Sequence, residues 1–563
     1  MAVCTRRDLL LLGTHSFVLQ SLHAVFVALF MEYYMHGFLL VDTCNGKKAG
    51  LADTCRWRVH ISKTGLCVLI AAQLVYTVCN VLDEADMVSF SSVVARAWRR
   101  IPRHRLASNE VRFAIAFGLS WCVLRLPLVP SAVSFTLATA IVGVLSDRCV
   151  FFAQNVAREV ATQRPREENV VLLASRGAAV VVLVAALLYD GSYPKRKSLH
   201  KFHWYLLGLC GVAVGIFSGP QRWRCNSHGE EAASAAREEC SLSMRSFSGF
   251  GDATMDFRGF ARQTWQRRSM KALLVVRALH CYAHAGVVGF FHLLLTLACA
   301  PRLSAAVRAV ILAFVVAAPS FLAPVHVAVA GLVGKKRLVL VMLLGVCALG
   351  FVSLVAAFFT RGALAVTVSP TRGEGSTVAR SGASVWLCAV LLTLLRLLLD
   401  SVRDVLELAQ EDVIEEDSIL FARATPMVAW TRRLCDLAKV PMESFSRIAG
   451  VLLLAFTNAF QGVVLVPPVA SGNGTTSQTT TAINNTSAAL ALEKTLLLPD
   501  SPAEVATTNM TSAVLAFLSL HTCGVALAML VVWYRYYNLE GKHLLFVQMA
   551  TRKRKDQQCV ALV

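Results

Sequence analysis

The chain alternates between long apolar runs and shorter polar segments. Each run is close to the about 20 residues that a helix needs to cross a bilayer. The pattern predicts an all-α polytopic membrane protein with about twelve transmembrane helices. The runs cover 9–30, 64–82, 113–130, 132–155, 171–189, 203–218, 272–299, 305–333, 338–360, 383–400, 446–466 and 512–534.

A polar stretch near the middle divides the predicted helices into six and six. Residues 219–271 are rich in Ser, Gly and Arg, and we interpret them as a solvated, largely flexible linker on the inward side. This gives an N-terminal half over 1–218 and a C-terminal half over 272–534. A basic cytosolic tail over 535–563 follows the last run.

The composition agrees with a membrane protein. Apolar residues make up 56% of the chain and charged residues 16%, and the mean hydropathy is +0.57. Soluble domains carry about 25% charged residues, so a soluble enzyme, a disordered protein and a secreted disulfide scaffold are excluded. Most cysteines lie in apolar runs as small buried hydrophobes. Cys44 and Cys55 share the first outward loop, where a disulfide and two free thiols are both open alternatives.

The net charge of +20 is explained by topology. If the N-terminus is inside, the inward segments carry more than twice as many Lys and Arg as the outward ones. We therefore expect both termini to be cytosolic and the basic residues to meet anionic lipid headgroups. Nucleic acid is not an expected partner. The expected partners are a small-molecule solute and membrane lipid, and the expected state is a monomer.

The last outward loop, 467–511, contains four N-glycosylation sequons. The acceptors are Asn473, Asn484, Asn485 and Asn509. Several sequons within one loop that the charge bias independently places outside predict a glycosylated loop. An unmodified polar loop is the alternative.

A short repeat links the two halves. Asp147-Arg148 precedes an Ala-Gln pair at the end of the fourth run, and Arg403-Asp404 precedes another after the tenth. A duplicated six-plus-six chain is typical of transporter folds with two related halves. We predict that these charges meet across the halves near the inward surface, either as a gate or as a structural lock.

The segments that follow these two positions carry a family resemblance. Residues 168–176 keep a Glu, a Leu and an Arg at the spacing of Glu-Arg-Thr-x-Leu-x-x-x-Arg, with Glu168 and Arg176 at its ends. The second segment runs Glu411-Asp412-Val-Ile-Glu415-Glu416-Asp417 and is followed by Arg423 and by Lys439-Val-Pro441. In these loops the chain resembles the major facilitator superfamily, in particular the glycoside–pentoside–hexuronide:cation symporter branch and its eukaryotic relatives. After the second run the branch's Asn-x-x-x-Asp-Pro is replaced by Asn80-Val-Leu-Asp83-Glu84-Ala85, so sodium coupling is not carried over.

The resemblance implies a major facilitator fold in which helices one, four, seven and ten line a central cavity. An ionisable group inside such a helix is costly and is read as functional by default. Each candidate has a structural alternative: Arg396 and Asp400 form an i,i+4 pair that neutralises itself, and His23 suits a packing role. The His280–His284 spacing suits a metal, but no further ligand motif accompanies it, so no metal or cofactor is predicted. The candidates for solute or proton binding are Gln20, His23, Arg277, His280, His284, Arg396 and Asp400.

Neither a Walker-type nor a dinucleotide-binding glycine motif occurs in the sequence. The sequence therefore predicts a secondary transporter and not an enzyme or an ATP-driven pump. It would work by alternating access, with histidines available for proton coupling. The alternative is a transporter-like protein that no longer transports and serves as a membrane scaffold or receptor.

Overall fold

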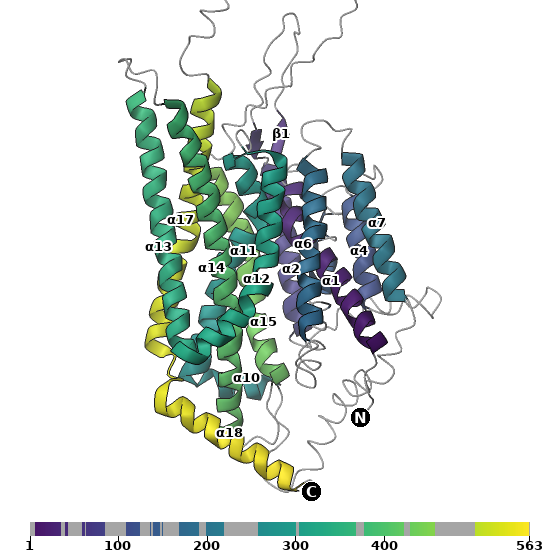
Figure 1. Ribbon diagram of the computed structural model, residues 1–563, viewed down its shortest axis with the longest axis vertical. Helices are drawn as coiled ribbons and strands as arrows, with labels where there is room; N and C mark the ends of the chain where they lie inside the picture. Colours follow the sequence, from purple (N-terminus) through teal and green to yellow (C-terminus); the bar gives the residue numbers. More distant parts are fainter. Residues whose placement is uncertain are drawn as a thin grey trace, which may run out of the picture.

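The computed structural model describes a chain that is almost entirely helical. The described residues are 6–34, 40–42, 59–61, 63–84, 109–123, 135–136, 139–146, 149, 168–190, 199–218, 257–299, 303–367, 377–421, 428–456 and 502–561. Figure 1 shows one bundle, with helices of the N-terminal part on one side and helices of the C-terminal part on the other. The first group is α1 (Arg6–Tyr34), α2 (Lys63–Glu84), α4 (Asn109–Val123), α6 (Glu168–Asp190) and α7 (Leu199–Ser218). The second is α10 (Phe257–Trp265), α11 (Arg268–Cys299), α12 (Ala305–Val333), α13 (Lys335–Thr367), α14 (Thr377–Leu420), α15 (Val428–Phe456), α17 (Pro502–Tyr536) and α18 (Gly541–Ala561).

The apolar runs locate most helices. Eleven of the twelve predicted runs overlap a described helix, and the run 305–333 coincides with α12. The run 132–155 is described only at 135–136, 139–146 and 149. Within the described residues, eight helices contain segments long and apolar enough to cross a membrane. The fold class is confirmed as an all-α polytopic membrane protein, while the number twelve stays a prediction.

Three segments are more ordered than the sequence suggested. The linker over 219–271 is not flexible throughout, because α10 occupies 257–265 and buries Phe260 against Trp430 of α15, with ring centroids 5.3 Å apart. The basic tail forms α18. In the first outward segment, β1 (Leu40–Asp42) pairs antiparallel with β2 (Val59–Ile61), with Val41 opposite His60. A search for apolar runs of membrane-spanning length does not detect short elements such as α10, β1 and β2, or a polar helix such as α18.

The turn between α12 and α13 is tight and depends on one glycine. Ser304 caps the start of α12 by accepting a hydrogen bond from the Val307 N–H at 3.3 Å. At the other end Gly334 adopts φ 90°, a left-handed conformation that disfavours side chains with a Cβ, and α13 begins at the next residue. The two long helices therefore run antiparallel with a single connecting residue.

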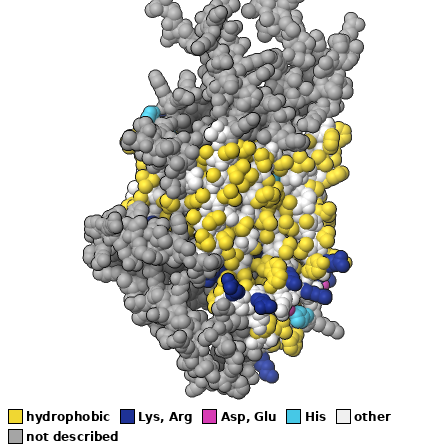
Figure 2. All heavy atoms as spheres, turned by 180° about the vertical axis from the view of Figure 1, so that it is seen from behind, with side chains coloured by type: hydrophobic (Ala, Val, Ile, Leu, Met, Phe, Trp, Pro, Cys, Tyr) yellow, Lys and Arg dark blue, Asp and Glu magenta, His cyan; other side chains and the backbone are white. Residues whose placement is uncertain are grey.

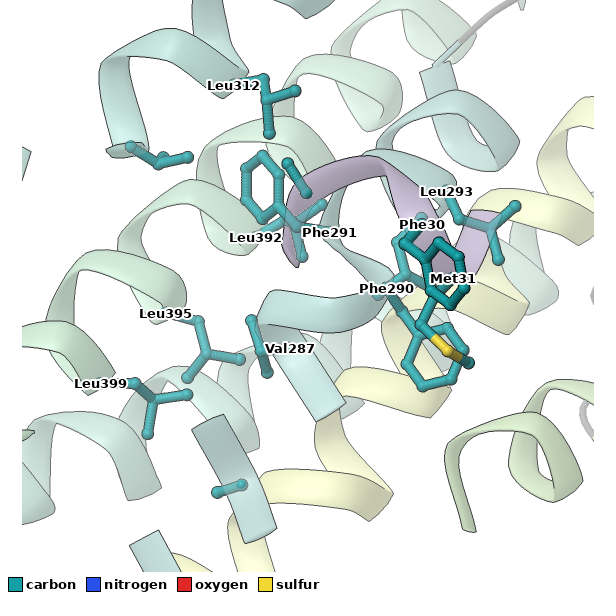
Figure 3. Close-up of a cluster of buried hydrophobic side chains, with 14 of the residues drawn as sticks. Phe30, Met31, Val287, Phe290, Phe291, Leu293, Leu312, Leu392, Leu395 and Leu399 are labelled. Carbon is teal, nitrogen blue, oxygen red and sulfur yellow. The ribbon is translucent and has the colours of Figure 1, made fainter. Parts of the chain in front are cut away.

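The two sides of the bundle meet along three pairs of helices: α1 with α11, α6 with α12, and α2 with α15. Figure 3 shows the apolar core where α1 reaches the C-terminal side, with Phe30 and Met31 of α1 beside Phe290 of α11. Leu312 of α12 and Leu392 of α14 close this cluster against α11. Apolar packing therefore continues across the boundary between the two sides.

The outer surface is apolar around its middle. Figure 2 shows a broad band of hydrophobic side chains with Lys and Arg gathered at its lower end. In Figure 1 the same lower end holds α10, α18 and the start of α1. Exposed Phe, Leu and Val side chains on α12, α13 and α17 belong in lipid and not in water. The chain is therefore an integral, multi-pass membrane protein.

Candidate functional site

Asp400 of α14 is the centre of a buried polar cluster. Its side chain is 2% exposed, and its Oδ1 lies 2.8 Å from Nε2 of His284 on α11. Its Oδ2 lies 2.8 Å from Nε of Arg396, one turn away on the same helix. Arg403 adds a third contact, with Nη1 3.4 Å from Oδ1. A buried carboxylate needs such partners, because an isolated charge in an apolar interior is strongly disfavoured.

His280 lies one turn below His284 on α11. Its Nε2 is 2.8 Å from the Leu399 carbonyl oxygen, and the two imidazole rings are stacked with centroids 5.4 Å apart. Both rings therefore have one nitrogen engaged with α14. No group of three His, Cys, Asp or Glu side chains suited to a metal ion is present in the part of the chain that the structure describes.

Arg277 lies one turn further toward the basic end of α11. Its Nε and Nη2 are enclosed, and neither has a hydrogen-bond partner among the described residues. Arg277 lies one turn from His280 on α11, and Arg403 lies one turn from Leu399, whose carbonyl oxygen His280 contacts, so both arginines belong to the same region of the two helices. Of the two α11 candidates Arg277 and His284, the structure brings His284 into contact with Asp400, and a role of Arg277 in solute binding stays a prediction.

A third helix completes the cluster. On α15, the Glu443 carboxylate lies 3.5 Å from Lys439 Nζ and 3.9 Å from Arg447 Nη2. Glu443 also interacts electrostatically with His284. The sequence analysis missed these residues because it began this helix at 446, whereas α15 begins at Val428 and carries Pro441 in its interior. Polar residues at 432, 436, 439, 443 and 447 follow helical spacing, which is the signal that reveals this face.

Arg447 also connects the cluster to the N-terminal side. Its Nη1 donates to the Gln73 side-chain oxygen on α2 at 3.2 Å. One turn away, Thr77 of α2 donates to the hydroxyl of Ser444 on α15 at 2.6 Å. The α2–α15 boundary is therefore polar at this level, in contrast to the apolar boundary in Figure 3.

The candidates on α1 form a separate and smaller group. His23 Nδ1 lies 2.6 Å from the Ser146 hydroxyl, and Gln20 donates to the Ser16 hydroxyl at 3.1 Å. Ser146 is the residue before Asp147 and Arg148, which lie outside the described residues. Their predicted contact with Arg403 and Asp404 stays a prediction. In the structure Arg403 contacts Asp404 at 3.4 Å, and Asp404 lies 3.5 Å from His326 of α12.

One buried pair that crosses between the two sides was not predicted. Oε2 of Glu32 on α1 lies 2.5 Å from Nδ1 of His292 on α11. The sequence analysis ended the first run at residue 30, before Glu32, and gave His292 no role. Both lie on helices that the resemblance assigns to the cavity, so a search of these helices to their ends would have found them.

The segments that carry the family resemblance are helical and not loops. Glu168 begins α6 and Arg176 lies in its third turn. Asp412, Glu415 and Asp417 lie in α14, which continues to Leu420, and Arg423 lies outside the described residues. The loops were expected there because charged residues were taken to end the helix. Helix α14 continues because basic side chains compensate these acids.

The compensating contacts come from three different elements. Lys335 Nζ lies 2.7 Å from Asp412 Oδ1 at the start of α13. Arg267, between α10 and α11, contacts Asp417 at 3.1 Å and Glu416 at 2.8 Å. His543 of α18 lies 3.1 Å from Glu416. We call this set the inward latch, after the side of the membrane on which the charge bias predicts it: Lys335, Arg267 and His543 on the acids 412–417 of α14.

The structure changes the predicted setting of one of the four sequons, while their glycosylation stays a prediction. Helix α17 begins at Pro502, so Asn509 lies in a helix and not in a loop, and the predicted loop 467–511 ends before 502. Asn473, Asn484 and Asn485 lie outside the described residues.

No protein-family model and no curated protein matches the sequence. Among solved structures, the fold is similar to a crystal structure of the nucleoside transporter NupG (D323A mutant), with a TM-score of 0.50, 11% identity, and coverage of 94% of this chain and all of that one. A bacterial homolog of the human lysosomal transporter Spinster gives a TM-score of 0.44 at 11% identity, covering 97% of this chain and 96% of that one. The xylose transporter XylE from E. coli gives 0.39 at 11% identity, covering 80% and 96%.

The match to NupG over nearly the whole chain assigns the fold. The protein has the fold of major facilitator-type membrane proteins. At this level of identity the likeness establishes the architecture and leaves the solute open.

Proposed function

We propose that the protein is a secondary transporter that moves a small solute by alternating access. The observation that carries the proposal is the Asp400 cluster, which joins α11 and α14 by the His284–Asp400 contact of 2.8 Å within two apolar membrane spans. Charged groups inside such spans are costly and mark substrate or ion pathways. The two groups of helices would rock about this level, with the solute bound between them.

The exposure of the cluster supports an aqueous pathway. The Arg403 side chain is 40% exposed and that of Lys439 is 35% exposed, although both lie inside long helices of the bundle. Arg403 lies within the apolar span of α14, where a charged side chain does not face lipid, so water or a solute has to reach it. His284 and Asp400 are placed to carry the proton if transport is proton-coupled.

The proposed orientation places the end with α10, α18 and both termini in the cytosol, because Lys and Arg gather there in Figure 2. The segment that carries Asn473, Asn484 and Asn485 then lies outside. We also propose that the protein acts as a monomer and is a divergent member of the glycoside–pentoside–hexuronide:cation symporter-like branch.

The test combines ligand binding with uptake. Purified protein is screened by thermal shift against sugars, organic acids, nucleosides and lysolipids, because a ligand that binds only the folded state raises the melting temperature. Compounds that stabilise it are then assayed for uptake into proteoliposomes. Arg277→Gln should abolish both responses while the melting temperature without ligand stays near that of the wild type. If Arg277→Gln unfolds the protein and leaves the ligand response of the remainder unchanged, Arg277 is structural.

A second candidate function is a transporter-like scaffold or receptor without transport. It is favoured by the altered Asn80–Ala85 segment. A protein that is stabilised by no solute and moves none in proteoliposomes, while keeping its fold, would establish this alternative.

A further inference from the structure

One face of the short helix α10 holds it against α15. Phe257, Phe260 and Thr264 follow one another at three and four residues, so they lie on one side of the helix. Phe260 and Thr264 are fully buried. The rings of Phe257 and Phe260 stand edge-on to Trp430 of α15, with centroids 6.1 and 5.3 Å apart. These contacts fix which side of α10 is turned away from the bundle.

The opposite face of α10 is cationic and exposed. Arg258, Arg262 and Trp265 follow one another at four and three residues on this side of the helix. Both arginines are exposed, and Trp265 is 53% exposed. An indole ring has an apolar body and a polar edge, and it suits a boundary between apolar and wet surroundings.

This face lies at the end of a membrane span. Helix α11 begins at Arg268, and its apolar segment of membrane-spanning length begins at the same residue. A turn joins the two helices, with the Arg267 N–H donating to the Thr264 carbonyl at 3.1 Å. Trp265 therefore lies three residues before the span, at the depth of the lipid headgroups where Trp is enriched. Figure 1 shows α10 at the lower end of the bundle, where Lys and Arg gather in Figure 2.

The cations of this region are only partly matched by acids. Residues 257–271 contain five Lys and Arg and no Asp or Glu. Arg267 is paired with Glu416 and Asp417 of α14, which are both buried and belong to the inward latch. The other four cations are exposed and form no ion pair with any residue that the structure describes. They are Arg258, Arg262, Arg268 and Lys271.

Lys271 connects the start of α11 to the exposed face of α10. Its Nζ lies 5.9 Å from the centre of the Trp265 ring, within the range of a cation–π contact. The four exposed cations and Trp265 thus form one surface, which we call the α10 surface. The adjoining turns of α15, residues 430–439, add three Lys and Arg against one Asp, so they do not neutralise it.

We infer that the α10 surface binds the phosphate groups of anionic phospholipids in the leaflet at the basic end of the bundle. Arginine matches phosphate with paired donors, and Trp265 lies among the headgroups. Lipid is favoured over a protein partner because the surface continues directly into the span that starts at Arg268. The inference holds whether or not the protein transports a solute. It assigns to particular residues a lipid contact that the sequence predicts only in general.

Trp265 itself reports the contact. Full-length protein is placed in phosphatidylcholine nanodiscs that contain either brominated phosphatidylserine or the same fraction of brominated phosphatidylcholine. The Trp265 signal is the difference in fluorescence between the wild type and Trp265→Phe. We expect phosphatidylserine to quench this signal more strongly, and high salt to reduce the difference between the two lipids. Equal quenching by both lipids would overturn the inference. No quenching by either would show that protein and not lipid covers this face.

Charge variants then locate the binding. Arg262→Gln should lower the apparent affinity for phosphatidylserine about fivefold, and Arg258→Gln together with Arg262→Gln about twentyfold, because each Lys or Arg near an anionic membrane contributes about fivefold. Lys336→Gln is the matched control, since Lys336 is already paired with Glu540 at 2.9 Å. An equal loss in the control would mean that phosphatidylserine responds to total charge and not to the α10 surface.

The melting temperature in pure phosphatidylcholine separates binding from folding. Substitutions of exposed side chains have small effects on stability, so the variants should melt like the wild type in the absence of phosphatidylserine. If the α10 variants melt earlier, Arg268→Gln with Lys271→Gln carries the test, because these two residues lie outside α10. An unchanged phosphatidylserine response in that second pair would overturn the inference. Solute uptake plays no part in these measurements, so their outcome is independent of the proposed transport.

Discussion

Glu32 of α1 and His292 of α11 join the two sides of the bundle through a buried contact. Their side chains are 2% and 0% exposed, and Oε2 and Nδ1 are 2.5 Å apart. Eight residues separate His292 from His284, so the pair lies about 12 Å along α11 from the Asp400 cluster, on the side away from the inward latch. Helices α1 and α11 are therefore in direct polar contact at this level.

Removing both partners of this pair should cost less than the sum of removing each one alone. Glu32→Ala leaves His292 buried without its carboxylate, and breaking a buried pair costs about 3–5 kcal/mol. Replacing both by Ala removes the uncompensated group as well. We expect the double variant to be less destabilised than the sum of the two single variants, as measured by thermal unfolding in detergent. Additive losses would show that the residues act independently.

A second contact between the two sides depends on a proline. Pro324 has no N–H to donate to the Ser320 carbonyl one turn earlier in α12. Arg176 of α6 donates to that carbonyl at 3.4 Å and lies over the Phe321 ring with its guanidinium carbon 4.0 Å from the centroid. The proline therefore creates the acceptor that links α6 to α12.

Restoring the N–H should weaken this link. In Pro324→Ala the new N–H of residue 324 donates to the Ser320 carbonyl, so this carbonyl no longer needs Arg176. Arg176→Gln should then destabilise the protein less than it does in the wild type, by a difference of at least about 0.5 kcal/mol. Pro319→Ala is the control, because Pro319 frees the carbonyl of Val315 and not that of Ser320. An equal effect of Arg176→Gln in all three backgrounds would mean that the contact with the carbonyl contributes nothing measurable.

Gly286 of α11 should not tolerate a methyl group. An added Cβ would overlap the imidazole of His521 on α17. His521 is held by the Ser446 hydroxyl at 3.1 Å, and that hydroxyl donates to the Tyr282 carbonyl at 2.6 Å, so the ring has little room to move. Gly286→Ala should lower the stability by about 1–3 kcal/mol. Gly289→Ala is the matched substitution, since its Cβ would meet only Met31 at 3.9 Å. Equal melting temperatures for the two variants would refute this account.

We expect N-glycan on the sequons that precede α17 and none on the fourth. Asn473, Asn484 and Asn485 precede α17, whereas Asn509 lies within it, two residues before the apolar span that begins at Thr511. Sequon acceptors are typical of surface loops. The triple substitution of the first three Asn by Gln should therefore increase gel mobility as much as glycosidase does, and Asn509→Gln alone should leave mobility unchanged. A shift caused by Asn509→Gln would show that this sequon is also glycosylated and would contradict the expected difference between the sites.

The apolar runs predicted the architecture because a membrane-spanning helix leaves a strong local signal. The run 305–333 reproduces α12 to the residue. The i,i+4 pair Arg396–Asp400 could likewise be predicted from the sequence, since both residues lie on one helix. Contacts between helices that are distant in sequence could not be predicted. That His284 meets Asp400 and His292 meets Glu32 depends on how α11 packs against α14 and α1, and spacing along the chain carries no information about it.

Charged residues caused the errors in the helix boundaries. Polar positions were taken as loops at 411–417 and before 446, yet both belong to long helices. Asp412 and Asp417 remain helical beside Lys335 and Arg267, which are distant in sequence. The charged face of α15 with Lys439, Glu443 and Arg447 was missed for the same reason. In a membrane protein a charge interrupts an apolar run without ending the helix.

The length of α14 has a mechanical consequence. Its 44 residues span about 66 Å, about twice the thickness of the hydrocarbon core. Asp400 lies 16 residues from Glu416, a lever arm of about 24 Å. A tilt of about 10° around Asp400 displaces Glu416 by about 4 Å, which exceeds the 2.8 Å between Glu416 and Arg267. If the proposed rocking motion tilts α14 about Asp400, it has to break the contacts of the inward latch or carry α10 and α18 along with it, so that the positions of these two helices report the tilt of α14 inside the bundle.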